Sequence, residues 1–256
     1  MIVRNQFIAG LANKGKREDG RKLDEFRKIS VEKNAIPNAE GSARVKIGNT
    51  DVIVGVKLSV GKPFSDNPDE GVLISNAELS PMAHPSFESG PPSEQSIELA
   101  RVVDRGIRES HAVDVKKLCI KVGEAVWMVN IDTQVMNHDG NLIDASSLAA
   151  AVALECAQMP AYDEATAKVD TDKKSGKLPL VDRPIAVTLY KIGTKLVADP
   201  TYIEEQAATA RLTVSTTHDG QIAALQKGGI EPLSLDEIKE CFRISVERGK
   251  EIRKHI

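Results

Sequence analysis

Three arginines with helical spacing are the residues of this chain best suited to bind phosphate groups. Arg101, Arg105 and Arg108 follow an i, i+4, i+7 pattern, which places their side chains on one face of a helix. Each guanidinium group offers a fork of N–H donors that matches the oxygens of a nucleic-acid phosphate. The alternative is a solvated helix face, on which Glu98 pairs with Arg101 and Asp104 pairs with Arg108.

Two short segments place a histidine beside an aspartate, as acid–base chemistry would require. They are His138-Asp139-Gly140 and His218-Asp219-Gly220. Asp-Gly is also a common composition of tight turns, and turns are the preferred interpretation of both segments. We therefore expect no catalytic group in either of them.

The arginines need a helix to hold them, and the sequence predicts one over residues 93–110. Ser93 is a suitable N-cap for this helix. Its expected buried stripe consists of Ile97, Ala100, Val103 and Ile107. A second helix over residues 142–159 is rich in alanine, which predicts burial on most sides, and Pro160 ends it.

Alternation of apolar and polar residues predicts strands that pair as hairpins. Residues 43–60 alternate on both sides of I-G-N-T-D, and residues 118–136 alternate around Gly123-Glu124. Residues 71–79 form a further strand. Trp127 lies within the second hairpin, where we expect it in the core or at an interface.

The second half of the chain repeats this organisation with different spacing. Strands are predicted at 184–190, 194–198, 210–217 and 221–226, followed by a helix at 235–254. Ser234 and Glu237 match a capping box at the start of that helix. The composition of residues 161–181 predicts a linker or a hairpin between the halves. Within this segment, residues 169–177 are expected to form a solvated loop. These elements together indicate an α+β fold with two β/α halves, mixed sheets and packed helices.

Composition excludes several classes of protein. The 256 residues are 41% hydrophobic and carry a net charge of −3, so the surface is not uniformly basic. No run of about 18 apolar residues is present, and no membrane contact is expected. Cys119, Cys156 and Cys241 have no C-x-x-C spacing, which argues against disulfides and zinc. We expect a cytoplasmic protein without a metal or other cofactor.

Four ordered segments together resemble the RNase PH family of phosphorolytic exoribonucleases. They are R-E-D-G-R-K-L-D-E-F-R at 17–27, S-E-Q-S-I-E-L at 93–99, V-D-R-P-I-A at 181–186 and A-D-P-T-Y-I-E-E at 198–205. The resemblance covers nearly the whole chain and implies an RNase PH-like fold. It implies an N-terminal helical extension at 1–28, a first domain at 29–165, a connecting segment at 166–184 and a second domain at 185–256. It also implies a structural role for Glu204-Glu205.

Residues that the family uses for chemistry are replaced in this chain. An adjacent arginine pair that holds RNA and phosphate falls on Glu94 and Gln95. A Gly-Ser-Arg phosphate motif falls on residues 140–144, which read G-N-L-I-D. Asp182 matches one family aspartate, but the second falls on Gly176. A carboxylate close to a polyanion is repulsive by roughly 1 kcal/mol or more. The resemblance therefore implies no catalytic residue.

The segment G-N-L-I-D-A-S-S at 140–147 makes the chain most similar to the non-catalytic ring subunits of archaeal exosomes. That resemblance implies a catalytic RNase PH-like paralogue as partner in a hexameric ring of three heterodimers. It also implies cap subunits with S1 or KH domains, and single-stranded RNA. It favours RNA binding by Arg101 and Arg105, and less so by Arg108. The alternatives are a self-sufficient phosphorolytic 3′–5′ exoribonuclease and a structural protein without RNA contact.

Overall fold

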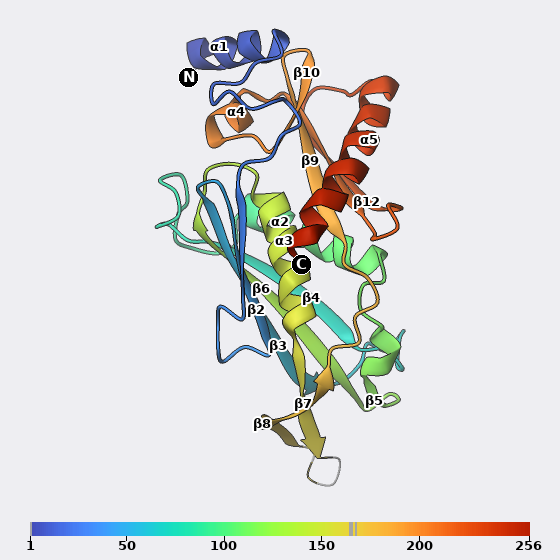
Figure 1. Ribbon diagram of the computed structural model, residues 1–256. Coiled ribbons are helices and arrows are strands. Elements are labelled where there is room, and N and C mark those ends of the chain that lie inside the picture. The colour runs from blue at the N-terminus through green and yellow to red at the C-terminus, as the bar shows by residue number, and fades with distance from the viewer. Residues whose placement is uncertain (1, 164–165, 167) are drawn as a thin grey trace.

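The computed structural model describes residues 2–163, 166 and 168–256. It shows an α+β chain with two main sheets, one above the other in Figure 1, and with helices packed against both of them. A short hairpin projects from the lower end, and the N-terminal helix lies at the upper end. The expected fold class of mixed sheets and packed helices is confirmed.

The first sheet contains six strands, with β4 parallel to β6 and all other pairs antiparallel. The strands are β1 (Ile29–Lys33), β2 (Gly41–Ile47), β3 (Thr50–Gly61), β4 (Val72–Leu79), β5 (Cys119–Lys121) and β6 (Ala125–Asn137). Their order is β1-β2-β3-β6-β4, and β5 pairs with β6. Both predicted hairpins and the buried position of Trp127 are confirmed. The alternation of apolar and polar residues predicted these strands because helices bury one face of the sheet.

Helix α2 (Glu94–Glu109) packs on β4, and Ser93 accepts a hydrogen bond from the Ser96 amide as its N-cap. The predicted buried stripe is partly wrong, because Ile97 is 48% exposed and Ala100 is half-buried. The buried residues are Ser96, Leu99, Val102, Val103, Gly106 and Ile107. The helix contacts β4, α3 and the second sheet, so its buried face is wider than a single stripe and is displaced from Ile97.

Helix α3 (Leu142–Cys156) lies across β2 and β3 and is buried along nearly its whole length, as its alanine content predicts. It ends three residues earlier than expected. Residues 158–160 instead enter β7 (Gln158–Asp163), which pairs with β8 (Lys168–Lys177). The predicted solvated loop at 169–177 is therefore wrong as a loop, although most of its side chains are exposed. The expectation of a hairpin within residues 161–181 is confirmed, because β7 pairs with β8.

The second sheet has the order β10-β9-β11-β12 and is antiparallel throughout. Its strands are β9 (Ile185–Ile192), β10 (Lys195–Ala198), β11 (Ala210–Thr216) and β12 (Ile222–Gly229). The helices around it are α1 (Ile2–Asn13), α4 (Tyr202–Ala207) and α5 (Leu235–Ile252), with short 3-10 turns at Val115–Leu118 and Arg253–His255. The capping box of Ser234 and Glu237 is confirmed. Helix α1 packs on α4 and β9.

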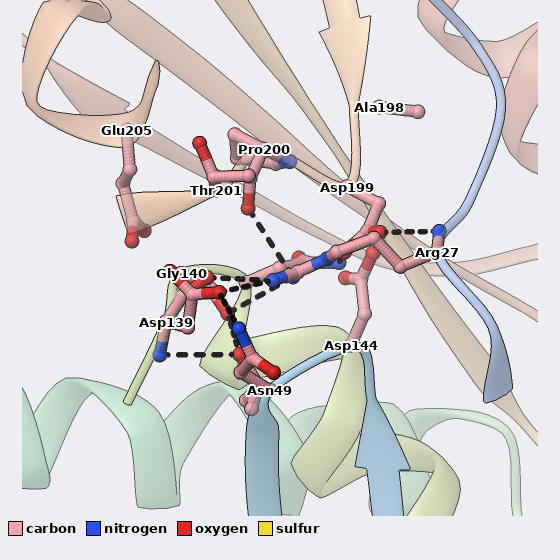
Figure 2. Close-up of polar contacts among 12 residues, drawn as sticks. Arg27, Asn49, Asp139, Gly140, Asp144, Ala198, Asp199, Pro200, Thr201 and Glu205 are labelled. Carbon is pink, nitrogen blue, oxygen red and sulfur yellow. Dashed lines mark hydrogen bonds and ion pairs between the residues drawn. The ribbon is translucent and has the colours of Figure 1, made fainter. Parts of the chain in front are cut away.

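A buried polar network centred on Asp199 holds three distant parts of the chain together (Figure 2). Arg27 donates from Nε and Nη2 to the two carboxylate oxygens of Asp199, at 2.9 and 2.7 Å. The same guanidinium donates to the carbonyl oxygen of Asp139 at 2.7 Å, and Asn141 donates to Asp199 at 2.8 Å. The segment before β1, the turn before α3 and the end of β10 therefore meet at one carboxylate.

Two further arginines complete the network. Arg17 donates to both carboxylate oxygens of Glu204, at 2.9 and 2.6 Å, and to the carbonyl of Asp199 at 2.8 Å. Arg21 donates to the Asp199 carboxylate at 3.0 Å. Burial alone would raise the pKa of Asp199, but its hydrogen bonds and ion pair with Arg27 outweigh burial and lower it. Asp199 is therefore a buried anion that needs its arginines.

We predict that Asp199→Asn destabilises the chain by about 3–5 kcal/mol, the usual cost of breaking a buried ion pair. Asparagine tolerates the left-handed backbone of position 199, which has φ of 44°, so the loss reports the missing charge. Urea denaturation measures it. Asp24→Asn is the matched control, because Asp24 pairs with Arg248 near the surface and should cost less than about 1 kcal/mol. Equal losses in the two variants would contradict the prediction.

Candidate functional site

A polar cavity of about 280 Å³ lies where α2, the start of α3, α4 and the second sheet meet. Its lining residues are Ser86, Gln95, Glu98, Leu99, His138, Leu142, Ile143, Tyr190, Tyr202, Glu205, Gln206 and Arg211. The two halves of the chain thus build its walls together. The Asp199 network sets their relative position, because it joins the turn before α3 to the segment before α4.

Several of the replaced family positions converge on this cavity. Gln95 stands at the place of one arginine, and Leu142 and Ile143 stand within the place of the phosphate motif; all three line the cavity. Gly176 lies in the projecting hairpin β7–β8. The cavity is therefore built from the expected segments but with different side chains.

Asp182 does not line the cavity, and its carboxylate instead binds the turn between β11 and β12. Its Oδ1 accepts a hydrogen bond from the His218 amide at 3.0 Å, and its Oδ2 lies 2.9 Å from His218 Nδ1. This contact with Asp182 raises the pKa of His218 above its usual value. The segment 218–220 forms the turn between β11 and β12, as predicted.

Charged groups inside the cavity are paired with one another. Arg211 Nη2 lies 2.5 Å from Glu98 Oε2, and Gln226 Nε2 donates to Glu98 Oε1 at 3.4 Å. The hydroxyl of Tyr190 donates to Glu205 Oε1 at 2.6 Å. Burial raises the pKa of Glu205 above its usual value, although Tyr190 and Arg211 oppose the shift. The predicted pair of Glu98 with Arg101 is wrong, because α2 packs beside the second sheet and Glu98 finds Arg211 there.

His138 is a buried, neutral member of a ring cluster beside the cavity. Its ring lies 5.4 Å from Phe87, 5.3 Å from His84 and 5.1 Å from Tyr202. Burial, together with the nearby charge of His84, lowers the pKa of His138 to about 4. The imidazole therefore adds no positive charge to the cavity near neutral pH. Residues 138–140 lead from β6 into α3 and are held by Thr50 and Arg27, which agrees with a structural turn.

The arginine face of α2 lies outside the cavity, and two of its three side chains remain available. Arg101 and Arg105 are exposed. Arg101 makes no hydrogen bond or ion pair with another described residue, and Arg105 makes one contact of 3.5 Å with Gln226. Arg108 instead donates to both carboxylate oxygens of Asp104, at 3.1 and 3.0 Å, and to the Leu73 carbonyl at 3.0 Å. The alternative interpretation as an ion pair thus holds for Arg108.

The Glu204-Glu205 pair is divided between two structural tasks. Glu204 binds Arg17 and closes the capping box of α4 with Thr201, whereas Glu205 binds Tyr190. Across the described part of the chain, no group of three or more His, Cys, Asp or Glu side chains is arranged to hold a metal ion. Within the same residues, no helix has the length and apolar character needed to span a membrane. All three cysteines are free thiols.

Sequence reasoning missed two contacts that hold the charged groups of the cavity. They are the ion pair of Glu98 with Arg211 and the hydrogen bond of Tyr190 to Glu205. Arg211 belongs to a strand without any motif, and Tyr190 reads as an ordinary strand residue. Only Glu204-Glu205 carried a signal, because this pair stands in the A-D-P-T-Y-I-E-E segment of the family resemblance.

Asp144 is a fully buried carboxyl group at the base of α3. Thr188 donates to it from its amide at 3.1 Å and from its hydroxyl at 2.7 Å, and Thr213 lies 2.9 Å from that hydroxyl. Burial raises the pKa of Asp144 to about 7, although the Thr188 hydrogen bonds oppose the shift. The folded chain therefore keeps a proton there that the unfolded chain releases near pH 4.

The wild-type chain should lose stability between about pH 4 and pH 7, as Asp144 ionises. We predict that Asp144→Asn does not show this loss. Because the folded pKa is raised, the wild-type free energy of unfolding falls as pH rises through this window, by about 4 kcal/mol at most. Asparagine keeps an acceptor for the Thr188 amide, and its NH₂ group can donate to the Thr188 hydroxyl once that hydroxyl turns its own proton to Thr213. Urea denaturation from pH 4 to 8 gives the difference. Asp66→Asn, at an exposed loop position, should follow the wild-type curve; an identical trend in Asp144→Asn would contradict the prediction.

Comparisons with known proteins agree with this architecture. The model of the 3′ exoribonuclease family, domain 1, matches residues 25–160, and that of domain 2 matches residues 182–248. The exosome complex component Rrp42 of Methanocella arvoryzae is 50% identical, covering 99% of this chain and 95% of the relative. The component of the same name from Methanosarcina acetivorans is 48% identical, covering 98% and 92%.

Solved structures give the same result. A chain of the Archaeoglobus fulgidus exosome with RNA bound to the active site has a TM-score of 0.92 and 44% identity, and the match covers 98% of this chain and 97% of that one. The two family models together cover most of the chain, in the order domain 1 then domain 2. The chain therefore belongs to the 3′ exoribonuclease family with the RNase PH fold.

Proposed function

We propose that this chain is a non-catalytic subunit of an archaeal exosome, a complex that degrades RNA from the 3′ end by phosphorolysis. In this role it structures the active site of a catalytic paralogue and contributes to RNA binding. One observation carries the proposal. The cavity at the family's phosphate site has glutamine, leucine and isoleucine at the replaced positions, and the guanidinium that lines it is bound by Glu98.

Phosphorolysis makes demands that this cavity does not meet. Inorganic phosphate attacks the terminal phosphodiester, so the site must hold two anionic groups and protonate the leaving oxygen. Here Glu98 and Glu205 place carboxyl groups at the wall, and His138 is neutral because burial lowers its pKa to about 4. Asp182 is bound to His218 away from the cavity. This arrangement supports a subunit that acts through its partner.

Arg101 and Arg105 supply the RNA contact in this proposal, and Arg108 is the weakest of the three. The first two are exposed and lie one helical turn apart, within reach of neighbouring phosphates of one extended strand. Arg108 would have to leave Asp104 and the Leu73 carbonyl before it bound RNA. Helix α2 thus carries two exposed arginines between its middle and its C-terminal end.

The remaining partners follow from the relatives. Those relatives are exosome components. We therefore propose that a catalytic RNase PH-like paralogue is the partner of this chain in a hexameric ring of three heterodimers. We also propose cap subunits of the S1 or KH type and a cytoplasmic location. We also propose residues 1–28 as an N-terminal extension, 29–165 and 185–256 as the two domains, and 166–184 as the connection. The projecting hairpin β7–β8 lies between the two matched regions.

We predict that the purified chain alone does not shorten RNA in the presence of phosphate. The physical reason is that Glu98 binds the guanidinium group of Arg211 in the cavity, and that Asp182, the matched family aspartate, is bound to His218 outside it. Release of nucleoside diphosphates from a labelled oligoribonucleotide, with and without phosphate, is the measurement. Phosphate-dependent release by a preparation free of any paralogue would instead support the self-sufficient enzyme.

We predict that replacing Arg101 and Arg105 together by alanine weakens RNA binding by the reconstituted ring. Each lost single-strand phosphate contact should lower the slope of log K against log salt by about 0.7. Assembly should survive, because exposed arginines contribute little to folding. Fluorescence anisotropy at several salt concentrations measures the binding, and light scattering measures the ring.

The matched control for this test is Arg243→Ala, which removes an exposed arginine from α5 that pairs with Glu240 and Glu247. It should leave the affinity for RNA and the salt slope unchanged. Wild-type binding by the Arg101/Arg105 variant would make these side chains ordinary surface charges. Loss of the ring would assign them to the subunit interface instead.

A further inference from the structure

The ring of His218 lies between two carboxylates, one at each of its nitrogens. Its Nδ1 lies 2.9 Å from Asp182 Oδ2, and its Nε2 lies 2.9 Å from Asp219 Oδ1. A neutral imidazole carries only one N–H group, so its second nitrogen would direct a lone pair at a carboxylate. Both contacts are therefore favourable together only when the ring is protonated. We propose that His218 is a protonated clamp, which joins the turn between β11 and β12 to the segment before β9 and opens when the ring loses its proton.

The clamp connects segments that are far apart in the sequence. Asp182 lies between β8 and β9, whereas His218 and Asp219 form the tip of the turn between β11 and β12. The carboxylate of Asp182 also accepts a hydrogen bond from the His218 amide at 3.0 Å. The amides of Val181 and Asp182 donate to the carbonyl of Ala112, three residues after the end of α2, at 2.7 and 3.3 Å. The clamp thus ties the second sheet to a segment that also holds the chain after α2.

The charges of the two carboxylates favour the protonated ring. The hydrogen bond and the charge of Asp182, together with the charge of Asp219, raise the pKa of His218 above its usual value. The charge of Arg253, in the turn that follows α5, opposes this shift but is outweighed. The guanidinium of Arg253 donates to the carbonyl oxygens of neighbouring residues and leaves both carboxylates to His218.

Two further cations lie near the clamp, and neither replaces His218. The side chain of Arg183 is bound by Glu155 at 2.7 Å. Lys250 of α5 lies beside Gly220 of the turn and is exposed, so water screens its charge. Burial would raise the pKa of Asp182, but hydrogen bonds from His218 and from the Arg183 amide outweigh burial and lower it. Asp182 is therefore an anion that accepts the imidazolium.

The two carboxylates differ in exposure, and this difference decides which contact opens. The side chain of Asp182 is 9% exposed, whereas that of Asp219 is 62% exposed. A nearly buried carboxylate loses more when its donor is removed, because water does not replace that donor. The neutral ring therefore keeps its proton on Nδ1, toward Asp182, and releases Asp219 to water.

The clamp is closed over a limited range of pH. Because the pKa of His218 is raised, its stabilising contact is complete below the usual value of 6.5 and is lost as pH rises through the raised pKa. Asp182 sets the acid limit, because its contact is lost as pH falls through its lowered pKa. The clamp lies within one chain, so it neither requires nor excludes the proposed ring.

The test is NMR spectroscopy of the full chain with ¹⁵N-labelled histidine, titrated from about pH 5 to about pH 9. We expect the His218 ring to be protonated on both nitrogens at the acid end, with a titration midpoint above 6.5. The neutral form should carry its proton on Nδ1. Signals of the ring itself are needed because Asp144, with a pKa of about 7, changes global stability in the same range.

Asp219→Asn should shift the midpoint of His218 downward, because one of its two carboxylates is removed, and should keep the neutral proton on Nδ1. Asp182→Asn should also shift the midpoint downward, and should move the neutral proton to Nε2, toward Asp219. A merely structural contact would not exchange the tautomer in this way. The matched control is Asp236→Asn, which removes an exposed carboxylate from the start of α5 and should leave the midpoint of His218 at its wild-type value.

Circular dichroism reports whether each variant is folded. Should Asp182→Asn not fold, the wild-type tautomer and Asp219→Asn, which changes an exposed side chain, still decide the question. The proposal is overturned if wild-type His218 titrates at or below 6.5, if its neutral ring is protonated on Nε2, or if folded Asp219→Asn titrates as wild type does. RNA binding by the ring is measured independently, so the two proposals fail separately.

Discussion

The carboxylate of Asp199 joins the two halves of this molecule. It has no exposed surface and receives hydrogen bonds from Arg27, Arg21 and Asn141, which come from the N-terminal segment and the start of α3. A buried anion without such donors costs several kcal/mol, so the segments can separate only by leaving the charge unpaired. The cavity depends on this constraint in part, because the start of α3 and α4 border both the cavity and the network.

Two of the four sequence segments that carry the family resemblance form the two sides of this network. R-E-D-G-R-K-L-D-E-F-R supplies Arg17, Arg21 and Arg27, and A-D-P-T-Y-I-E-E supplies Asp199 and Glu204. Their recurrence therefore reflects folding, since neither segment satisfies its charges alone. Resemblance in such segments is strong evidence for a fold and weak evidence for an activity, which is decided by the side chains around the cavity.

Local patterns predicted most of the fold, and long-range contacts account for what they missed. Period-2 alternation identified the hairpin of β2 and β3, and Ser234 with Glu237 identified the start of α5, because a few neighbouring residues determine each feature. Residues 169–177 were expected to form a solvated loop and instead form most of β8, because a strand that is mostly exposed has no apolar alternation. The pairing of Glu98 with Arg211 escaped it because these residues are 113 positions apart and no local rule favours Arg211 over Arg101.

The distribution of burial separates the residues that hold the architecture of this site from those at the rim of its cavity. Side chains of the Asp199 network are almost fully buried, so a substitution there exposes a charge to the core and threatens the fold. Gln95 and Glu98, by contrast, lie at the rim of the cavity, and about a third of the Glu98 side chain is exposed. An exposed side chain at such a rim can be substituted at little cost in stability, whereas Leu142 and Ile143 in the same cavity wall are buried. The core therefore holds α2, and the arginines on it, in place independently of the exposed side chains at the rim.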